Sequence, residues 1–391
     1  MNPTPPRIAI IGAGPGGLTC ARVLQRRGVP VTVFDRDASA DARPQGGTLD
    51  LHLTTGQAAL RAAGLHDEFT TLARPEGQQM RLLDHTGTVL FAHHPAPDEH
   101  ARPEIDRGQL RRLLLRSLAP ETVRWGHYLR TLHPLGDGRH RAEFDGGHTE
   151  TFDLVIGADG AWSRVRPLLS DATPHYSGVT FVEFGLDDVD NRHPELARLV
   201  GDGSMMAPFA NRALIAQRNS NGHIRGYAAF RGSEDWTLDA GVRMADTEAV
   251  RAVLLDTFAG WDEGLLALLR ENDGGFLNRP LFALPVPHTW THTPGLTLLG
   301  DAAHLMTPFS GMGANLAMLD GAELAEALAG HDDRDSALRA YEAAMLPRSA
   351  EAAEGAARGL ANAIAPDAPQ GSLRHVRRMA EQAERTGQEG P

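Results

Sequence analysis

The sequence has almost no cysteine: Cys20 is the single one among 391 residues. A disulfide within the chain is therefore excluded, and so is the disulfide-rich class of small secreted domains. This usage is typical of a reducing compartment, and we expect a cytoplasmic protein. The spacing around Cys20 places it inside the first helix, where we expect a small, buried, unreactive side chain.

Positive charge and long apolar runs are also scarce. Lys and Arg number 38 against 50 Asp and Glu, which gives a formal charge of −12. We therefore expect no nucleic acid and no membrane surface as a partner. The longest uncharged candidate for a membrane span, residues 280–300, holds four prolines. The first six residues lack the features of a signal peptide. The expected partner is a small molecule, and the expected state is a monomer.

The hydrophobic pattern predicts an α/β chain of more than one domain. Residues 7–11 and 31–34 are apolar and strand-like, and residues 17–25 between them have helical spacing. Residues 151–156 and 296–299 have the same buried-strand character, and residues 313–328 predict a long helix. Short alternating runs with Asn/Gly turns predict an inserted antiparallel sheet from about residue 177 to 240. The Ala-rich residues 336–364 predict a helical end with a break at Pro347.

The first strand runs directly into a glycine-rich turn, Gly12-Ala13-Gly14-Pro15-Gly16-Gly17. Glycines at the first, third and sixth positions allow a tight turn, close approach of a pyrophosphate, and close helix packing. The helix that follows points its free N–H groups at the phosphates. Asp35 ends the second strand and can accept hydrogen bonds from a ribose, which favours FAD or NAD over NADP. The alternative is a glycine turn without a ligand.

Two later segments carry a family resemblance. Gly157-Ala158-Asp159-Gly160 and the residues up to 166 resemble the Asp-Gly motif of the flavin-dependent aromatic hydroxylases. Residues 299–308, with Gly300-Asp301 near their start, resemble the Gly-Asp motif of the same superfamily, known as class A. Within it the chain looks most like the tetracycline-inactivating flavin monooxygenases, through residues 46–52, 103–107, 300–308 and 309–315.

The resemblance implies a fold and a domain division. The fold is a Rossmann-like FAD-binding domain with an inserted antiparallel-sheet substrate domain and a C-terminal bridging helix. We expect residues 1–172 and 275–335 to bind FAD, residues 173–274 to bind substrate, and residues 336–391 to form the helical segment.

The resemblance also implies roles around FAD. The first turn holds the pyrophosphate, Asp35 and Arg36 the adenosine half, and Asp301 the ribityl or phosphate part. Arg107 and Arg111 face the ring and pyrophosphate region. Asp159 supports the flavin and the reductant side, and residues 308–315 lie along the ring. The expected cofactor-binding residues are Gly12, Gly14, Pro15, Gly17, Asp35, Arg36, Asp50, Arg107, Arg111, Asp159, Asp301, Pro308, Gly311, Gly313, Ala314 and Asn315.

Physical reasoning supports the last of these segments. Gly311 and Gly313 open the long helix, and its positive end can stabilise negative charge on a reduced flavin ring. The alternative for residues 311–313 is a flexible loop.

The chain has one dinucleotide fingerprint, so a second nucleotide would bind transiently. The resemblance implies that NADPH or NADH reduces FAD and that O2 then forms a flavin C4a-hydroperoxide, which hydroxylates a small aromatic or polyketide-like substrate. FAD carries this chemistry. We therefore expect no catalytic side chain, and no metal. The pairs His93-His94 and His288/His292 are interpreted as loop histidines.

The inserted sheet is expected to line the substrate cavity. At two positions, Ser204 and Arg225, the tetracycline-inactivating enzymes carry an Arg and a His that contact the drug. This departure leaves open whether the substrate is a tetracycline, another polyketide, a phenol or another aromatic natural product. The expected substrate-binding residues are Glu183, Ser204, Met206, Phe209, Arg225 and Tyr227, with Phe184 and Ala216 as further candidates.

Two other functions stay open at this point. A flavin reductase or halogenase could use the same scaffold, although no Trp-x-Trp-x-Ile-Pro motif is present. A non-catalytic flavin-fold protein could bind or sequester an unstable metabolite in the same pocket.

Overall fold

The structure is a computed structural model that describes residues 6–43, 46–96 and 99–378. The chain divides into two compact units. The first unit comprises Met1–Ala73, Ile105–His175 and Phe282–Ala356. The second comprises Arg74–Glu104, Tyr176–Leu281 and Ala357–Pro391. No helix among the described residues is both long and apolar enough to cross a membrane.

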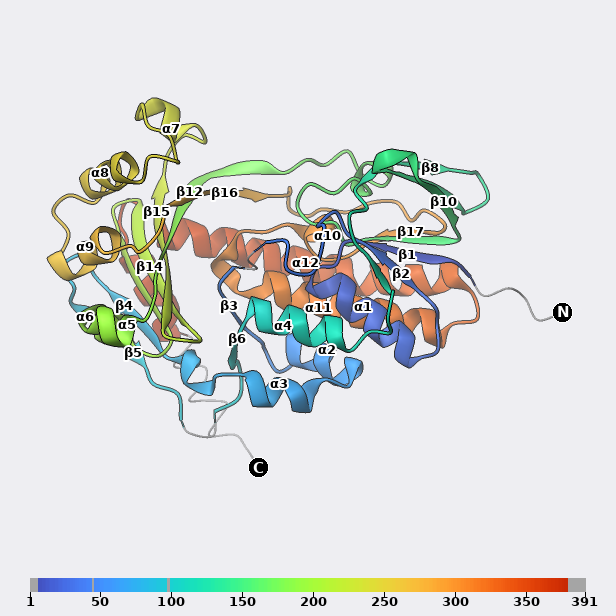
Figure 1. Cartoon of the computed structure of the whole chain (residues 1–391), viewed down its shortest axis with the longest axis horizontal. Coiled ribbons are helices and arrows are strands. Elements are labelled where there is room, and N and C mark those ends of the chain that lie inside the picture. The colour runs from blue at the N-terminus through green and yellow to red at the C-terminus, as the bar shows by residue number, and fades with distance from the viewer. Residues whose placement is uncertain (1–5, 44–45, 97–98, 379–391) are drawn as a thin grey trace. The chain divides into compact units, whose positions relative to one another are not determined.

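A five-stranded parallel sheet lies at the centre of the first unit (Figure 1). Its order is β17 (Leu296–Leu298), β11 (Leu154–Gly157), β1 (Ile8–Ile11), β2 (Thr32–Phe34) and β7 (Val123–Arg124). Every neighbouring pair is parallel. All residues of β1, β11 and β17 are buried, as expected for strands covered on both faces. The predicted α/β fold is therefore confirmed.

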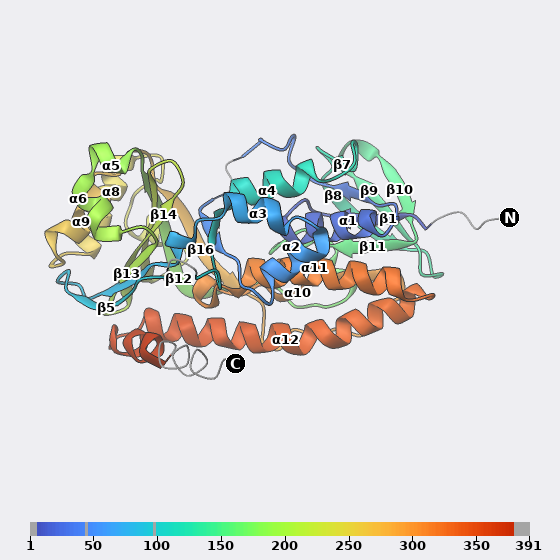
Figure 2. The same ribbon diagram turned by 90° about the horizontal axis from the view of Figure 1, so that it is seen from below.

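Helices α1 (Pro15–Arg26) and α11 (Met312–Gly330) pack closely together in the first unit, as Figure 2 also shows. A Cβ on Gly16 would lie 2.5 Å from the Ala317 carbonyl oxygen, and one on Gly321 would lie 2.3 Å from that of Gly16. Glycine is therefore required at this helix crossing. Cys20 lies in α1 and is fully buried, which confirms its expected place in the core.

The other elements of the first unit surround this centre. They are β3 (Thr48–Asp50) paired with β6 (Glu104–Asp106), the small sheet of β8 (Leu129–Pro134), β9 (His140–Phe144) and β10 (Thr149–Phe152), and helices α2 (Gly56–Ala63), α3 (His66–Leu72), α4 (Arg107–Arg116) and α10 (Asp301–His304).

The second unit is built on a seven-stranded sheet. Its order is β16 (Leu277–Ala283), β12 (His175–Leu186), β15 (His223–Arg231), β14 (Arg212–Asn219), β13 (Ser204–Phe209), β4 (Met80–Leu83) and β5 (Val89–His93). The pairs among β12 to β15 are antiparallel, which confirms the sheet expected over residues 177–240. The helices of this unit are α5 (Val189–Arg192), α6 (Pro194–Val200), α7 (Trp236–Asp239), α8 (Thr247–Thr257) and α9 (Glu263–Arg270).

The break expected at Pro347 is wrong, because α12 runs from Arg334 to Ala363 with Pro347 inside it. Side chains before and after the proline hold the helix. Tyr341 donates a hydrogen bond to the Leu298 carbonyl at 2.9 Å, and Arg348 is paired with Asp320 at 3.0 Å. These tertiary contacts outweigh the cost of one missing N–H donor.

Candidate functional site

The three motifs of the sequence meet at one edge of the parallel sheet. Gly12 follows β1, Asp159 follows β11, and Gly300 follows β17. Backbone hydrogen bonds join the strand ends, from Ala158 N–H to the Ile11 carbonyl at 2.8 Å and from Leu299 N–H to the Gly157 carbonyl at 2.9 Å. The carboxyl edge of an open parallel sheet is the usual position of a nucleotide site.

The glycines of the first turn have two different roles. Gly12 has a φ of +113°, and a Cβ there would lie 2.2 Å from the Ala158 carbonyl oxygen. A Cβ on Gly17 would lie 2.2 Å from the Gly12 carbonyl oxygen. Both glycines are thus required by the packing of the chain itself. A Cβ on Gly14 would meet nothing within 4 Å, so the N-terminus of α1 has open space where a pyrophosphate would bind.

Asp35 is positioned by the glycine-rich turn. Its carboxylate accepts hydrogen bonds from Ala13 N–H at 2.7 Å and from Asp37 N–H at 2.8 Å. Each carboxylate oxygen can accept a further bond, so a ribose hydroxyl could still bind. Arg36, the next residue, is exposed.

The two arginines of α4 differ in their surroundings. Arg111 is buried, and its Nε donates to the Ala13 carbonyl at 3.4 Å while another nitrogen bonds the Ala40 carbonyl. Burial lowers the pKa of Arg111, against the opposing charges of Asp35 and Asp37. Arg107 is exposed at the first residue of α4. We interpret Arg111 as a brace of the glycine-rich turn and Arg107 as the arginine open to a ligand.

Asn315, in the first turn of α11, joins three segments of the first unit and is fully buried. Its Oδ1 accepts from His52 N–H at 2.9 Å, Gly56 N–H at 3.1 Å and the Thr55 hydroxyl at 3.1 Å. Its Nδ2 donates to the carbonyls of Asp50 at 2.8 Å and Gly311 at 3.1 Å. Both amide hydrogens are used, so its side chain fixes the start of α11. No local sequence pattern predicted this role.

The rest of this segment is open. Gly311 has a φ of +66° and lies against the carboxylate of Asp50, since a Cβ there would be 3.4 Å from it. A Cβ on Gly313 would meet nothing within 4 Å. Pro308 is exposed and Ala314 is partly exposed. The N-terminus of α11 is therefore a second place where the backbone can approach a ligand.

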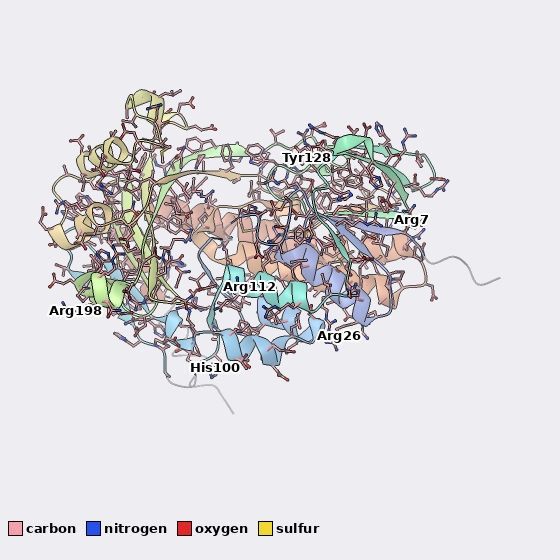
Figure 3. The ribbon with its side chains drawn as sticks, in the orientation of Figure 1. Arg7, Arg26, His100, Arg112, Tyr128 and Arg198 are labelled. Atoms are coloured by element: carbon pink, nitrogen blue, oxygen red, sulfur yellow. The ribbon has the colours of Figure 1, made fainter. Side chains whose placement is uncertain are left out.

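The carboxylates of Asp159 and Asp301 differ in how accessible they are to a ligand. The Asp159 carboxylate accepts from the Ser163 hydroxyl at 2.6 Å and from Arg164 N–H at 2.7 Å, so it caps its own loop. Burial raises the pKa of Asp159. Arg164 also donates to the hydroxyl of Tyr128, labelled in Figure 3, at 3.0 Å. Asp301 is exposed at the start of α10 and can contact a ligand directly.

In the second unit, five of the six expected substrate-binding residues share one face of the sheet. The register pairs Glu183 with Tyr227 and Gly185 with Arg225, and β13–β14 pairing continues the same face to Met206 and Ser204. The opposite face packs against α6, α8 and α9 through Val182, Leu214 and their neighbours.

Phe209, Phe184 and Ala216 lie on that opposite face, away from the other five residues. Phe209 packs against Trp261, with 6.4 Å between ring centroids, and Phe184 and Ala216 are buried in the core of the unit. Phe209 is an odd number of residues from Ser204 and Met206 along β13, and side chains alternate between faces.

A charged cluster occupies the sheet face that carries Glu183, Arg225 and Tyr227. Both oxygens of the buried Glu183 are bonded, one to Arg225 and the other to Nε of Arg279 at 3.1 Å. The formal charge of the three side chains together is +1. Arg279 lies in β16 and was not expected from the sequence, because it is about 100 residues from Glu183.

His94, His288 and His292 lie in loops, as expected. His93 is the last residue of β5. His288 is buried and bonds the Ala303 carbonyl, whereas His292 bonds Glu342 at 2.9 Å and Asp335 at 3.2 Å. Among the described residues no three or more His, Cys, Asp or Glu side chains gather as a metal site would require.

Comparisons with known proteins agree with this geometry. A family profile described as "FAD binding domain" matches residues 6–228 and 288–356. Monooxygenase penA from Penicillium thymicola is 34% identical, over 88% of this chain and 92% of that protein. The structure of Klebsiella pneumoniae HpxO with FAD and uric acid has a TM-score of 0.80 at 21% identity, covering 96% of this chain and 92% of that chain. Tetracycline destructase Tet(51) has a TM-score of 0.71 at 20% identity, covering 95% and 94%. These two structures are similar to the chain in fold.

Proposed function

The chain belongs to the FAD-binding family of flavin-dependent monooxygenases, and on that premise we propose that it uses NADH or NADPH and O2 to hydroxylate a small aromatic or polyketide-like substrate. One observation carries the proposal. Gly14, Asp301 and the start of α11 lie in the same unit, and a side chain at Gly14 or Gly313 would meet open space. An extended dinucleotide fits such a row of glycine-lined backbone.

When bound, FAD supplies the transfer of two electrons from NAD(P)H to O2 and the delivery of one oxygen atom to the substrate. Overall, substrate, O2, NAD(P)H and one proton give hydroxylated substrate, water and NAD(P)+. The N-terminus of α1 would hold the pyrophosphate at Gly14, and Asp35 the ribose. Asp301 would accept a hydroxyl hydrogen bond, and the N-terminus of α11 would stabilise negative charge.

The sheet face of Glu183, Arg225 and Tyr227 supports the assignment of the substrate to the second unit. A ring system could pack on Tyr227 and Met206, and the two guanidinium groups around Glu183 could bond an enolate, phenolate or carboxylate oxygen. Relatives and neighbours whose names contain uric acid or tetracycline are consistent with a ring compound. We propose this class rather than tetracycline itself, and a monomer as the working state.

The test is to purify the protein and measure NAD(P)H oxidation in air with a panel of phenols, benzoates and tetracyclines. The expected result is substrate-stimulated oxidation and a product heavier by one oxygen atom. A change in the flavin spectrum without any product would instead indicate a sequestering protein. A product that gains a halogen, or NAD(P)H oxidation that no substrate changes, would also overturn the proposal.

Replacing Arg225 by Gln is expected to raise KM for the active substrate about tenfold, because a charge-assisted hydrogen bond is lost. FAD content should stay unchanged. Arg212→Gln is the matched control, since Arg212 lies in the same sheet and bonds the Thr257 carbonyl. A fall in FAD content without a change in KM would show that Arg225 has a different role.

Replacing Asp301 by Ala is expected to weaken FAD binding about tenfold, through loss of one charge-assisted hydrogen bond. The carboxylate is exposed, so the melting temperature of the flavin-free protein should not change. Fluorescence titration with FAD measures the effect, and Asp332→Ala, also exposed, is the control. Unchanged FAD affinity would exclude the role given to Asp301.

A further inference from the structure

A buried hydrogen-bonded pair of His304 and Asp320 lies directly behind the Gly300-Asp301 turn. His304, the last residue of α10, has its Nε2 2.6 Å from Oδ2 of Asp320, and both side chains are almost fully buried. The same oxygen accepts from Gly300 N–H at 3.2 Å. Asp320 therefore holds both ends of α10, and Arg348 bonds its other oxygen at 3.0 Å.

The other side of His304 faces a small cavity within the first unit. The cavity has a volume of about 10 Å³, and its lining includes His288, His304, Ser349 and Ala353. Nδ1 of His304 and Nε2 of His288 are both buried and have no hydrogen-bond partner in the protein. Both side chains, each more than nine-tenths buried, line this one cavity. Such groups are costly unless something bonds them.

The chemistry of the two nitrogens is complementary. A carbonyl only accepts hydrogen bonds, so Nδ1 of His288 must donate to Ala303, which leaves Nε2 of a neutral ring as an acceptor. Burial lowers the pKa of His288, which favours that neutral ring. Asp320 accepts from Nε2 of His304 and, despite burial, raises the pKa of His304. With the His304 ring protonated, its Nδ1–H is a donor to the cavity.

We propose that this cavity is a binding site for one structural water, which joins His304 to His288 and so makes His304, His288 and Asp320 positioning residues for the Gly300-Asp301 turn. The water accepts from His304 and donates to His288. Ser349, which also lines the cavity, is a further acceptor for it, since its hydroxyl already donates to the Leu346 carbonyl and can still accept. A volume of about 10 Å³ with three polar partners meets the requirements for a buried water. The part of the proposal that concerns the turn rests on the proposed function.

The first test asks whether a substitution that fills the cavity raises or lowers the melting temperature. Ala353→Val in the full chain would fill the space and displace the water, leaving two buried nitrogens without a partner. We expect a melting temperature a few degrees below that of Ala344→Val, which has the same change of helix propensity at an exposed position of α12. In a dry apolar cavity the added methyl groups would stabilise the protein. A melting temperature of Ala353→Val equal to or above that of Ala344→Val therefore overturns the proposal.

A crystal structure of the unmodified chain gives an independent answer if Ala353→Val does not fold. We expect electron density in the cavity within about 2.7–3.2 Å of both nitrogens. A cavity without density, or direct contact between the two rings, overturns the proposal. Neither readout requires bound flavin, so both stand apart from the failure of the proposed function.

The positioning role has its own test. In Ala353→Val we expect about fivefold weaker FAD binding than in Ala344→Val, together with a changed ¹⁵N shift of His304 Nδ1 in histidine-labelled protein. His288→Gln keeps an acceptor and a donor on one side chain, so it should retain a higher FAD affinity than His288→Phe. Equal FAD affinity in all four variants would overturn the positioning role.

Discussion

Gly14→Val is expected to give a folded protein that no longer holds FAD. A Cβ at this position would meet nothing within 4 Å, and the backbone at Gly14 is extended (φ −78°, ψ 175°), which a β-branched residue readily adopts. The added methyl groups would therefore occupy ligand space without disturbing the core. We expect FAD affinity to fall about 100-fold or more, equivalent to about 2.8 kcal/mol, and the flavin-free melting temperature to stay within a degree or two.

The matched control is Gly330→Val, at the last residue of α11. A Cβ there would also meet nothing within 4 Å, but the position is far along the helix from its N-terminus. Flavin absorbance per protein and FAD titration should be normal in this variant. Gly12→Ala, in contrast, should destabilise the fold itself, because its Cβ would overlap the Ala158 carbonyl. If Gly14→Val keeps its flavin, the pyrophosphate does not bind at this turn.

Asn315→Ala is expected to cause the largest loss of stability among these substitutions. It removes five hydrogen bonds and leaves the buried N–H of Gly56 and the partly buried N–H of His52 without their acceptor. Each unsatisfied buried group costs about 1–3 kcal/mol, and relaxation offsets part of the sum, so we expect about 2–4 kcal/mol. FAD binding should weaken as well, because the start of α11 loses its fixed position.

Thermal and urea unfolding of the flavin-free protein measure this effect. Asn191→Ala makes the same change at an exposed residue of α5 and should alter stability by about 0.5 kcal/mol or less. A similarly small effect of Asn315→Ala would show that its hydrogen bonds are replaced at little cost.

The parallel sheet and its edge could be predicted because they depend on local signals. Glycines at fixed spacing after a strand, and buried strands before Asp159 and Asp301, are enough to place three motifs at one edge. The role of Asn315 could not be predicted, since its partners near residues 50–56 are about 260 residues away. Arg279 was missed for the same reason.

The helix break expected at Pro347 fails for a physical reason. The break at Pro347 followed from helix propensity, which packing around Tyr341 and Arg348 overrides. Strand alternation already places Phe209 on the other face of β13 from Ser204 and Met206. The pairing of β4 with β13 had no local signal, as parallel strands carry no turn between them.

The place of β17 in the parallel sheet also affects how late in synthesis the FAD site can form. β1 and β11 are synthesised early, but β17 and α11, which complete the carboxyl edge, come from residues 296–330. A nascent chain that stops before them leaves one side of β11 unpaired and apolar, a recognised hazard for aggregation. Cofactor capture must therefore follow synthesis of residues 296–330, and products truncated before them should be colourless and dependent on chaperones.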